Sequence, residues 1–318
     1  MGTYSRGDRH LGYSSRHTQV PVPATTSTFT IVSKPVTVKN DQNEDVPAAT
    51  GDATITQDQN GTTLTLITPA ENGTPQTVSI PKKVEVDYVK IERTFTSEKA
   101  STVYLPFSIA AANVKGGKFH RFTGVDENTW TVNYTEVTDN IEASTPYIFL
   151  PDGTGGGKIE VNNGSNKISV STANPHTTTQ GQWEFIGTYE PIQWLSDNDR
   201  ASEIGLVYGF AAEDKTDNGK NIAAGQFVKV AAGASIAPMR AYLKRTAVSG
   251  ARMRGAADEL PETMTVVLIS AGGEATTIGT ITLSYDTDEW YSLDGRKLSG
   301  KPTKKGLYIR NGKKTVVK

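Results

Sequence analysis

The chain has 318 residues, of which 36% are hydrophobic, and a formal net charge of −1; this length allows one large core or two to three small ones. Cysteine is absent, which excludes a disulfide framework and any metal site built on thiolates. No apolar run approaches the roughly 18 residues that a bilayer-spanning helix needs, so no transmembrane segment is predicted.

Residues 1–24 are rich in Gly, Ser and Arg and show little hydrophobic periodicity, so the sequence predicts a flexible leader there. From Thr28 onward, apolar and polar residues alternate in the manner typical of strands. Two β-rich runs then flank Asn60-Gly61, a dipeptide that strongly indicates a β-hairpin. We therefore predict a small antiparallel β module over residues 25–86.

Residues 87–246 are predicted to form the main domain, a β-sandwich. Strand-like runs recur about every 8–12 residues with turn signals between them, and this spacing favours a sandwich over βαβ units. Pro106 interrupts one run, which indicates a sheet edge or a bulge, and Asn163-Gly164 predicts a hairpin. The fold class predicted for the chain is thus all-β, with antiparallel, Ig-like or jelly-roll-like sandwich modules and a short C-terminal β tail.

The main domain holds several large aromatic residues that either fill its core or form a platform on which a sugar stacks. These residues are Trp130, Tyr134, Trp183, Tyr189 and Trp194. Residues that share a parity along a strand usually face a core, and this alternation favours the core. Because Trp194 stands next to an acidic loop, we expect it to be the exposed exception. Trp194, Asp197 and Asp199 are therefore a candidate ligand platform.

The end of the chain differs from the rest in charge. Residues 247–262 are small and charged and predict a linker. Residues 263–318 are predicted to form C-terminal β-hairpins, among them one through Gly272-Gly273 and one through Asn311-Gly312. The segment Arg296–Lys318 contains nine Lys or Arg and no Asp or Glu, so the residues before it carry a net charge of −10. A basic terminal strand discourages edge-to-edge aggregation; docking to a transport partner and binding to an anionic surface are the alternatives. Because Tyr308 is the only aromatic residue in this segment, no nucleic-acid partner is predicted.

Two short motifs frame this tail, Tyr-x-Leu-x-Gly-Arg and then Gly-Leu-Tyr-Ile with a later Gly-Lys-Lys. Their residues are Tyr291, Leu293, Gly295, Arg296, Gly306, Leu307, Tyr308, Ile309, Gly312, Lys313 and Lys314. The segment resembles the C-terminal sorting tails of secreted proteins of Bacteroidetes-type bacteria, which the type IX secretion machinery reads, although a full sorting domain is a whole β-sandwich. The resemblance implies an extracellular or cell-surface location, with the sorting machinery as a partner.

Parts of the main domain carry a second resemblance. The segments ERTFTSEKASTVYLPFSI, STPYIFLP, YGFAAE and GQFVKVAAGASIAPMRAYL resemble a region near the C termini of Bacteroidetes surface proteins. Those proteins include leucine-rich-repeat proteins of the BspA kind, although no leucine-rich repeat is visible in this chain. The resemblance implies that the chain is the C-terminal part of such a surface protein, and it carries over no reaction.

Patterns that indicate catalysis are weak. The four histidines lack the spacing of a zinc hydrolase, and no cysteine is available as a nucleophile. The Gly-rich segment before Lys158 lacks the Ser or Thr of a phosphate-binding loop, since Ile159 comes next. We therefore predict no catalytic residue, no metal and no cofactor.

These observations and the two resemblances favour a secreted, non-catalytic structural or adhesive protein of the cell surface. Such a protein is expected to self-associate by strand addition into a filament or a surface layer. The alternative is a carbohydrate-binding module of a glycan-utilising surface system, whose partner is a host or glycan surface ligand.

Overall fold

The computed structural model describes most of the chain. The described residues are 32–68, 73–154, 157–217, 220–246, 260–278, 290–292, 297–298, 302, 305–310 and 313–317. The chain divides into two compact units, Met1–Val32 and Ser33–Lys318, and nearly all described residues belong to the second. The predicted leader, residues 1–24, and most of the predicted linker, residues 247–259, lie outside the described residues.

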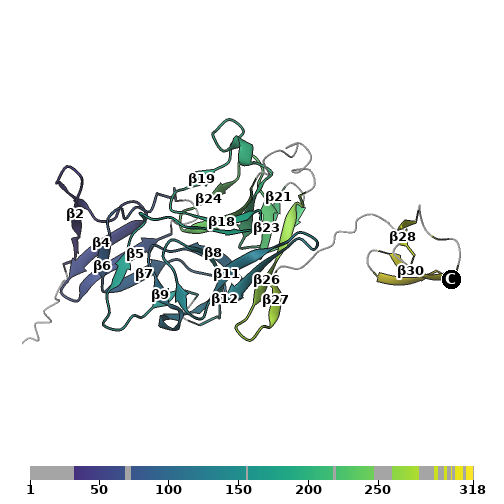
Figure 1. The fold of residues 1–318 in the computed structure, drawn as a ribbon, viewed down its shortest axis with the longest axis horizontal. Coiled ribbons are helices and arrows are strands. Elements are labelled where there is room, and N and C mark those ends of the chain that lie inside the picture. Colours follow the sequence, from purple (N-terminus) through teal and green to yellow (C-terminus); the bar gives the residue numbers. More distant parts are fainter. Residues whose placement is uncertain are drawn as a thin grey trace, which may run out of the picture. The chain divides into compact units, whose positions relative to one another are not determined.

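β-Strands form almost all regular structure in the described part, where no α-helix occurs (Figure 1). Two short 3-10 turns, η1 (Ala111–Asn113) and η2 (Ala201–Glu203), complete it. The prediction of an all-β fold is confirmed. Among the residues that the structure describes, no helix has the length and apolar character that crossing a membrane requires.

A four-stranded sheet opens the described chain, in the order β1-β4-β5-β7. Its strands are β1 (Lys34–Pro35), β4 (Ala53–Asp58), β5 (Gly61–Ile67) and β7 (Tyr88–Glu92). β4 and β5 form the predicted hairpin, because Asp58 pairs with Gly61 across the turn. β5 and β7 pair in parallel, so this sheet is not purely antiparallel and extends beyond the predicted module end at residue 86.

The main body is one sheet of eleven strands, in the order β17-β18-β25-β20-β23-β26-β12-β11-β14-β8, with β27 paired to β26. Its strands are β8 (Ser101–Tyr104), β11 (Gly117–Asp126), β12 (Thr131–Glu136), β14 (Pro146–Pro151), β17 (Thr177–Gln180), β18 (Trp183–Thr188), β20 (Val207–Ala211), β23 (Gln226–Lys229), β25 (Arg240–Arg245), β26 (Thr263–Ile269) and β27 (Ala275–Ile278). Neighbouring strands run antiparallel except β12 and β26, which are parallel.

β26 lies in the middle of this sheet, between β23 and β12. Residues 263–278 therefore belong to the sandwich, whereas their sequence pattern placed them with the C-terminal hairpins. Met264, Val266 and Leu268 are buried in the sandwich core, and such an alternation indicates a half-buried strand without indicating which sheet contains it. The hairpin predicted at Gly272-Gly273 is confirmed by the pairing of β26 with β27.

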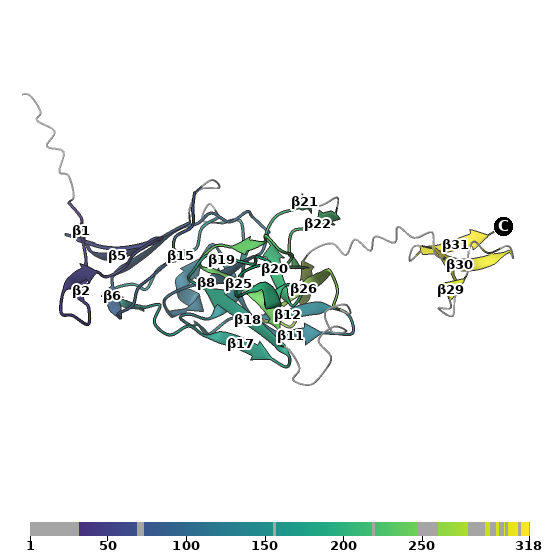
Figure 2. The ribbon, with the colours of Figure 1, turned by 90° about the horizontal axis from the view of Figure 1, so that it is seen from above.

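The large sheet curls until its β8 edge meets β25, which produces two packed layers (Figure 2). The Ala241 amide donates a hydrogen bond to Thr102 Oγ1 at 3.1 Å, and the Tyr104 amide donates to the Met239 carbonyl at 3.2 Å. Since β8 ends the strand order, the edge position that Pro106 predicted is confirmed. The largest side chains between the layers are Phe122, Tyr134, Trp183, Phe185, Tyr208 and Phe227.

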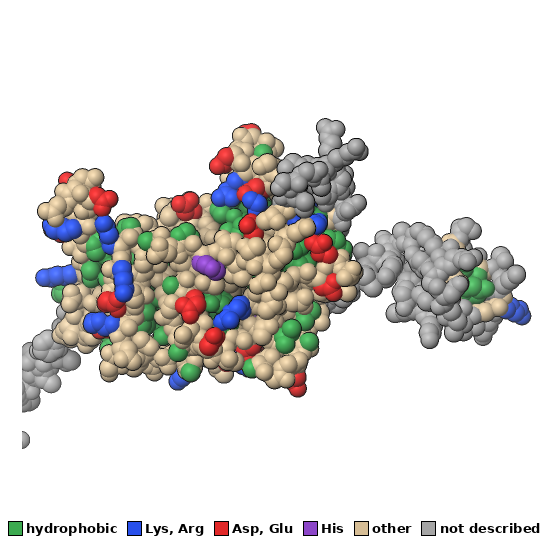
Figure 3. Space-filling model, viewed as in Figure 1, with side chains coloured by type: hydrophobic (Ala, Val, Ile, Leu, Met, Phe, Trp, Pro, Cys, Tyr) green, Lys and Arg blue, Asp and Glu red, His purple; other side chains and the backbone are tan. Residues whose placement is uncertain are grey.

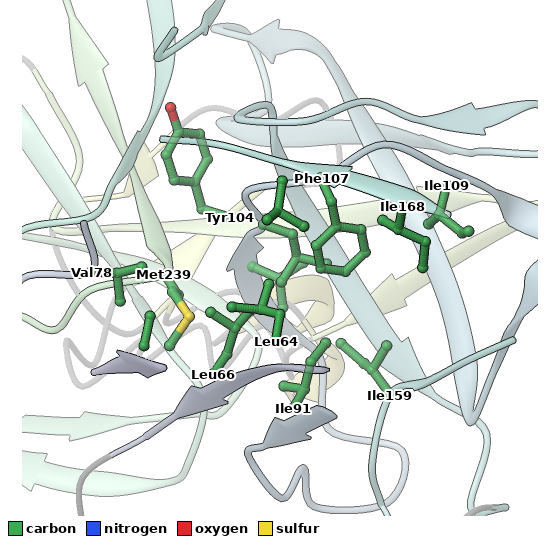
Figure 4. Packing of buried hydrophobic residues seen from close by; sticks show 14 of the residues in the cluster. Leu64, Leu66, Val78, Ile91, Tyr104, Phe107, Ile109, Ile159, Ile168 and Met239 are labelled. Carbon is green, nitrogen blue, oxygen red and sulfur yellow. The ribbon is translucent and has the colours of Figure 1, made fainter. Parts of the chain in front are cut away.

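A second core joins the first sheet to the sandwich (Figure 4). Leu64, Leu66 and Ile91 of the first sheet belong to the same buried cluster as Tyr104 of β8 and Phe107, which follows β8. The predicted domain boundary between residues 86 and 87 therefore falls inside a shared core. Burial of these apolar side chains away from water stabilises the junction.

The hairpin predicted at Asn163-Gly164 is wrong. A turn forms there, since the Asn166 amide donates to the Asn163 carbonyl at 3.2 Å, but the two flanking strands diverge to different partners. These pairs are β15 (Glu160–Val161) with β10 (Val114–Lys115), and β16 (Ile168–Val170) with β6 (Val84–Val86). The other short pairs are β2 (Thr37–Lys39) with β3 (Asp45–Pro47), β9 (Ile109–Ala110) with β13 (Asn140–Ile141), β19 (Ile192–Gln193) with β24 (Ser235–Ile236), and β21 (Lys215–Asp217) with β22 (Lys220–Ile222).

The predicted C-terminal β tail forms a sheet of four antiparallel strands in the order β29-β28-β30-β31. Its strands are β28 (Trp290–Tyr291), β29 (Lys297–Leu298), β30 (Gly306–Arg310) and β31 (Lys313–Val317). Arg310 pairs with Lys313, and the predicted turn residues Asn311 and Gly312 lie outside the described residues. Within the described part of the chain, these four strands pair only with one another.

Candidate functional site

The prediction that Trp194 is exposed is wrong. Its side chain is only 1% exposed and packs in a cluster with Ile192, Val207 and Tyr242. The Trp194 and Tyr242 rings meet edge to face, with centroids 5.2 Å apart. A buried indole usually needs a hydrogen-bond acceptor, and Glu203 Oε2 accepts from Trp194 Nε1 at 2.8 Å. Trp194 therefore stabilises the fold and presents no stacking face.

Asp197 and Asp199 are exposed in the loop after β19, so the predicted platform does not assemble around Trp194. The acid that contacts Trp194 is Glu203, which the sequence pattern did not single out. Glu203 also accepts from Lys244 at 2.9 Å and from Arg200 at 3.1 Å. Burial raises the pKa of Glu203, but the hydrogen bonds from Lys244 and Trp194 outweigh it, and the net pKa is lowered. Glu203 is thus the centre of a structural ion network.

The remaining aromatic candidates lie where the core interpretation placed them. Tyr134 and Trp183 are buried between the layers of the sandwich, and Tyr189 is buried in the core shared with the first sheet. Trp130 is half-buried and packs against the sandwich core. None of these four side chains offers a fully exposed ring to a sugar.

The C-terminal sheet brings the two tail motifs together. Tyr291 of β28 and Lys314 of β31 both pair with Ile309, one from each side of β30. Gly306 and Tyr308 lie on the same strand as Ile309, and Lys313 begins β31. The motif residues Gly295, Arg296 and Gly312 lie outside the described residues.

A cavity of about 750 Å³ lies beside the junction of β8 and β25. Its lining includes Ser101 and Thr102 of β8, Arg240 of β25, Phe210 of β20 and the loop through Ala234. This volume is in the range of small-molecule sites, and its lining mixes apolar with a few polar groups, as such sites do. On the face drawn in Figure 3, cationic and anionic side chains are interspersed and form no large patch of one sign. The cavity is therefore the best candidate site in the described part.

Two guanidinium groups converge on one hydroxyl at the wall of this cavity. Arg93, which is 7% exposed, donates from Nη1 to the Thr102 carbonyl at 2.9 Å and from Nη2 to Ser101 Oγ. Arg240 donates from Nη1 to the same Ser101 Oγ at 3.3 Å. The Arg93 guanidinium also lies 4.4 Å from the centroid of the Phe95 ring. Ser101 therefore connects a buried cation to a cation that lines the cavity.

Neither of these arginines has a carboxylate partner among the described side chains, where no ion pair involves Arg93 or Arg240. By contrast, Arg121, Arg200 and Arg245 each pair with an acid. Burial lowers the pKa of both Arg93 and Arg240, and the charge of Arg240 lowers the pKa of Arg93 further. Since arginine stays protonated in proteins, two uncompensated positive charges remain in a poorly solvated place.

Hydroxyl protons add to this donor set. Ser101 Oγ already accepts from two guanidinium groups, so its two lone pairs are used and its O–H proton is left to donate. Thr102 Oγ1 accepts from the Ala241 amide and likewise keeps its proton. Both residues are nearly buried and both contribute to the lining of the cavity. The wall is thus built from donors and positive charge, which is suited to holding an anion. The sequence pattern did not single out these residues, because Arg240 lies 139 residues after Ser101 in the chain and only the fold brings them together.

Other chemistry has less support in the described part of the chain. No three His, Asp or Glu side chains there lie together in a way that suits a metal ion. His120 is buried with Nδ1 unpaired, and burial lowers its pKa. No family model, no curated protein and no solved structure matches this chain. The two resemblances drawn from the sequence therefore stay predictions.

Proposed function

We propose that this chain is a non-catalytic β-protein of the cell surface or the extracellular space, with a structural or adhesive role. It assembles by addition of a strand from one copy to the sheet of another. The observation that carries this proposal is the position of β17 at the end of the large sheet, with no second ladder partner within the described residues (Figure 2). An exposed edge offers unpaired backbone groups to an incoming strand.

The two ends of the large sheet differ. At one end, all four residues of β8 are buried, and β25 covers this edge through the Thr102 and Tyr104 hydrogen bonds. At the other end, β17 has β18 as its only ladder partner within the described residues, and Thr177, Thr179 and Gln180 are exposed. Three β-branched threonines with no charge among them favour pairing rather than protection.

The C-terminal sheet supports the proposed location. Its motif residues Tyr291, Tyr308 and Lys314 lie on three adjacent strands, so a docking partner meets the two motifs within one small sheet. We assign the sorting machinery as that partner, on the resemblance of the tail.

Light scattering of the whole chain over a range of concentrations tests the assembly. We expect the mean mass to rise with concentration, and we expect Thr179→Lys to suppress this rise because a lysine on an edge strand opposes pairing. The matched control is Thr54→Lys, since Thr54 is exposed on β4, an interior strand of the first sheet. A chain that stays monomeric at high concentration, or equal assembly of the three proteins, contradicts the proposal.

A second candidate function is the binding of a carbohydrate, and the observation that favours it is the cavity of about 750 Å³. The half-buried ring of Phe210 supplies an apolar wall, and Ser101, Thr102 and Arg240 supply polar groups. Trp194 also contributes to the lining, so tryptophan fluorescence is expected to respond to a bound saccharide in a saturable way. No response over a broad panel of glycans removes this candidate.

A further inference from the structure

We propose that the cavity wall formed by Ser101, Thr102 and Arg240, backed by Arg93, holds the carboxylate of an acidic sugar. This inference rests on the second candidate function, saccharide binding in the cavity, and is independent of where the protein is located. All acidic sugars of this kind carry an oxyanion, the carboxylate, that accepts hydrogen bonds from guanidinium and hydroxyl groups.

The charge arrangement is the first argument. Two guanidinium groups that donate to the same oxygen atom repel one another, and their shared burial removes the water that would screen them. A nearby carboxylate normally compensates such charges, as it does for Arg121, Arg200 and Arg245. Since no described acid does so for Arg93 and Arg240, an anionic ligand is the group that completes the site.

The direction of the donors is the second argument. Ser101 Oγ accepts from both arginines, so its proton is left to donate to a group in the cavity that it lines. Arg240 donates to Ser101 through Nη1 and lines the same cavity, and its planar guanidinium carries further N–H groups that can donate to a ligand. A carboxylate accepts several such bonds at once, and charge-assisted hydrogen bonds are the stronger kind.

The size and lining of the cavity are the third argument. A cavity of about 750 Å³ is far larger than a bare anion and suits an organic molecule. The lining also includes small residues such as Ala232, Gly233 and Ala234, together with Phe210. These small residues leave room for a sugar ring, and Phe210 adds apolar character to the lining. The cationic side then selects the saccharides that carry a carboxylate.

Isothermal titration calorimetry of the whole chain tests the inference with three acidic sugars, galacturonate, glucuronate and N-acetylneuraminate. Galactose and glucose are the neutral counterparts, and sodium acetate is the bare anion. We expect at least one acidic sugar to bind at least about tenfold more tightly than the neutral sugars and acetate. A neutral sugar lacks the charge-assisted hydrogen bonds of the carboxylate, and acetate lacks the contacts of the sugar ring. Arg240→Gln is expected to remove this preference, and Ser101→Ala to weaken it.

Arg121→Gln is the matched control, because Arg121 is exposed on β11 and paired with Asp139. This variant should bind as the unaltered chain does. Thermal unfolding of each variant checks folding, and ligand-induced stabilisation of the unaltered chain gives a second readout that needs no variant. Equal affinity for neutral and acidic sugars overturns the inference but leaves saccharide binding intact. Binding of acetate as tightly as the sugar acids, or of no sugar at all, overturns both.

Discussion

The indole Nε1 of Trp194 donates a hydrogen bond of 2.8 Å to Oε2 of Glu203. Arg200 donates to the same oxygen atom, and Lys244 donates to Oε1 of Glu203. This contact ties the loop after β19 to the outer face of β25, the strand that carries Lys244. The exposed acids next to Trp194 in the sequence suggested that its ring is exposed. The acid that accepts its hydrogen bond is instead Glu203, nine residues later, and the ring is buried.

Replacing Trp194 with Ala is expected to lower the free energy of unfolding by about 3–5 kcal/mol, the range for removal of a large buried aromatic side chain. The same change at Trp130, which is half-buried, is expected to cost clearly less. Urea unfolding followed by circular dichroism measures both. A loss below about 1 kcal/mol for Trp194→Ala, within the range of ordinary surface changes, contradicts the structural role.

Glu203 predicts a pH dependence of stability. Its folded-state pKa lies below the ordinary value of 4.5, so its ionised form favours the folded chain. That contribution is fully present above pH 4.5 and is lost as the pH falls through the lowered folded-state pKa. We therefore expect the stability difference between the unaltered chain and Glu203→Gln to be large at pH 7 and to shrink below pH 4.5.

Chemical denaturation at pH 7 and at pH 3 measures this difference. Glu160→Gln is the control, since Glu160 is exposed on β15. A stability difference for Glu203→Gln that is unchanged between the two pH values contradicts the ion network.

The close approach of the Tyr104 ring to β18 requires a glycine at position 187. A Cβ atom at this position would lie 1.9 Å from Cδ2 of Tyr104, a fully buried ring of β8. Gly187→Ala therefore overpacks the core and should destabilise the chain by about 1–3 kcal/mol or more. Gly209→Ala is the counterpart on β20, where the nearest atom is 3.9 Å away, and it should be close to neutral. Equal melting temperatures of the two variants contradict this packing.

Deletion of residues 290–318 is expected to leave the melting temperature of the sandwich unchanged. In the described part, the four strands of the C-terminal sheet pair only with one another, so their loss breaks no ladder of the large sheet. Differential scanning calorimetry compares the two chains. A drop of more than a few degrees in the sandwich transition would show that the tail supports the sandwich.

Local features of the fold were predictable because they depend on neighbours in sequence. The β4–β5 hairpin follows from turn residues between two alternating runs, and the β26–β27 hairpin follows from Gly272-Gly273. The edge position of β8 follows from Pro106, which has no N–H to donate. The burial of Tyr134 and Trp183 follows from their alternation with polar residues.

Long-range features were not predictable from one sequence. The parallel pairs β5–β7 and β12–β26 join strands separated by intervening elements, and turn signals do not report such pairing. Glu203 and the Arg93–Ser101–Arg240 cluster depend on how the large sheet curls, which brings β8 against β25. Residue type alone does not mark those side chains, because an arginine in a polar run usually lies on the surface.

The most direct test of the proposed surface role is the location of the protein in the cells that make it, measured by surface labelling and by assay of the culture medium. The account predicts that the whole chain reaches the surface or the medium, and that a chain without Trp290–Lys318, still folded, stays inside. Equal export of both chains, or a whole chain found only inside the cell, contradicts it.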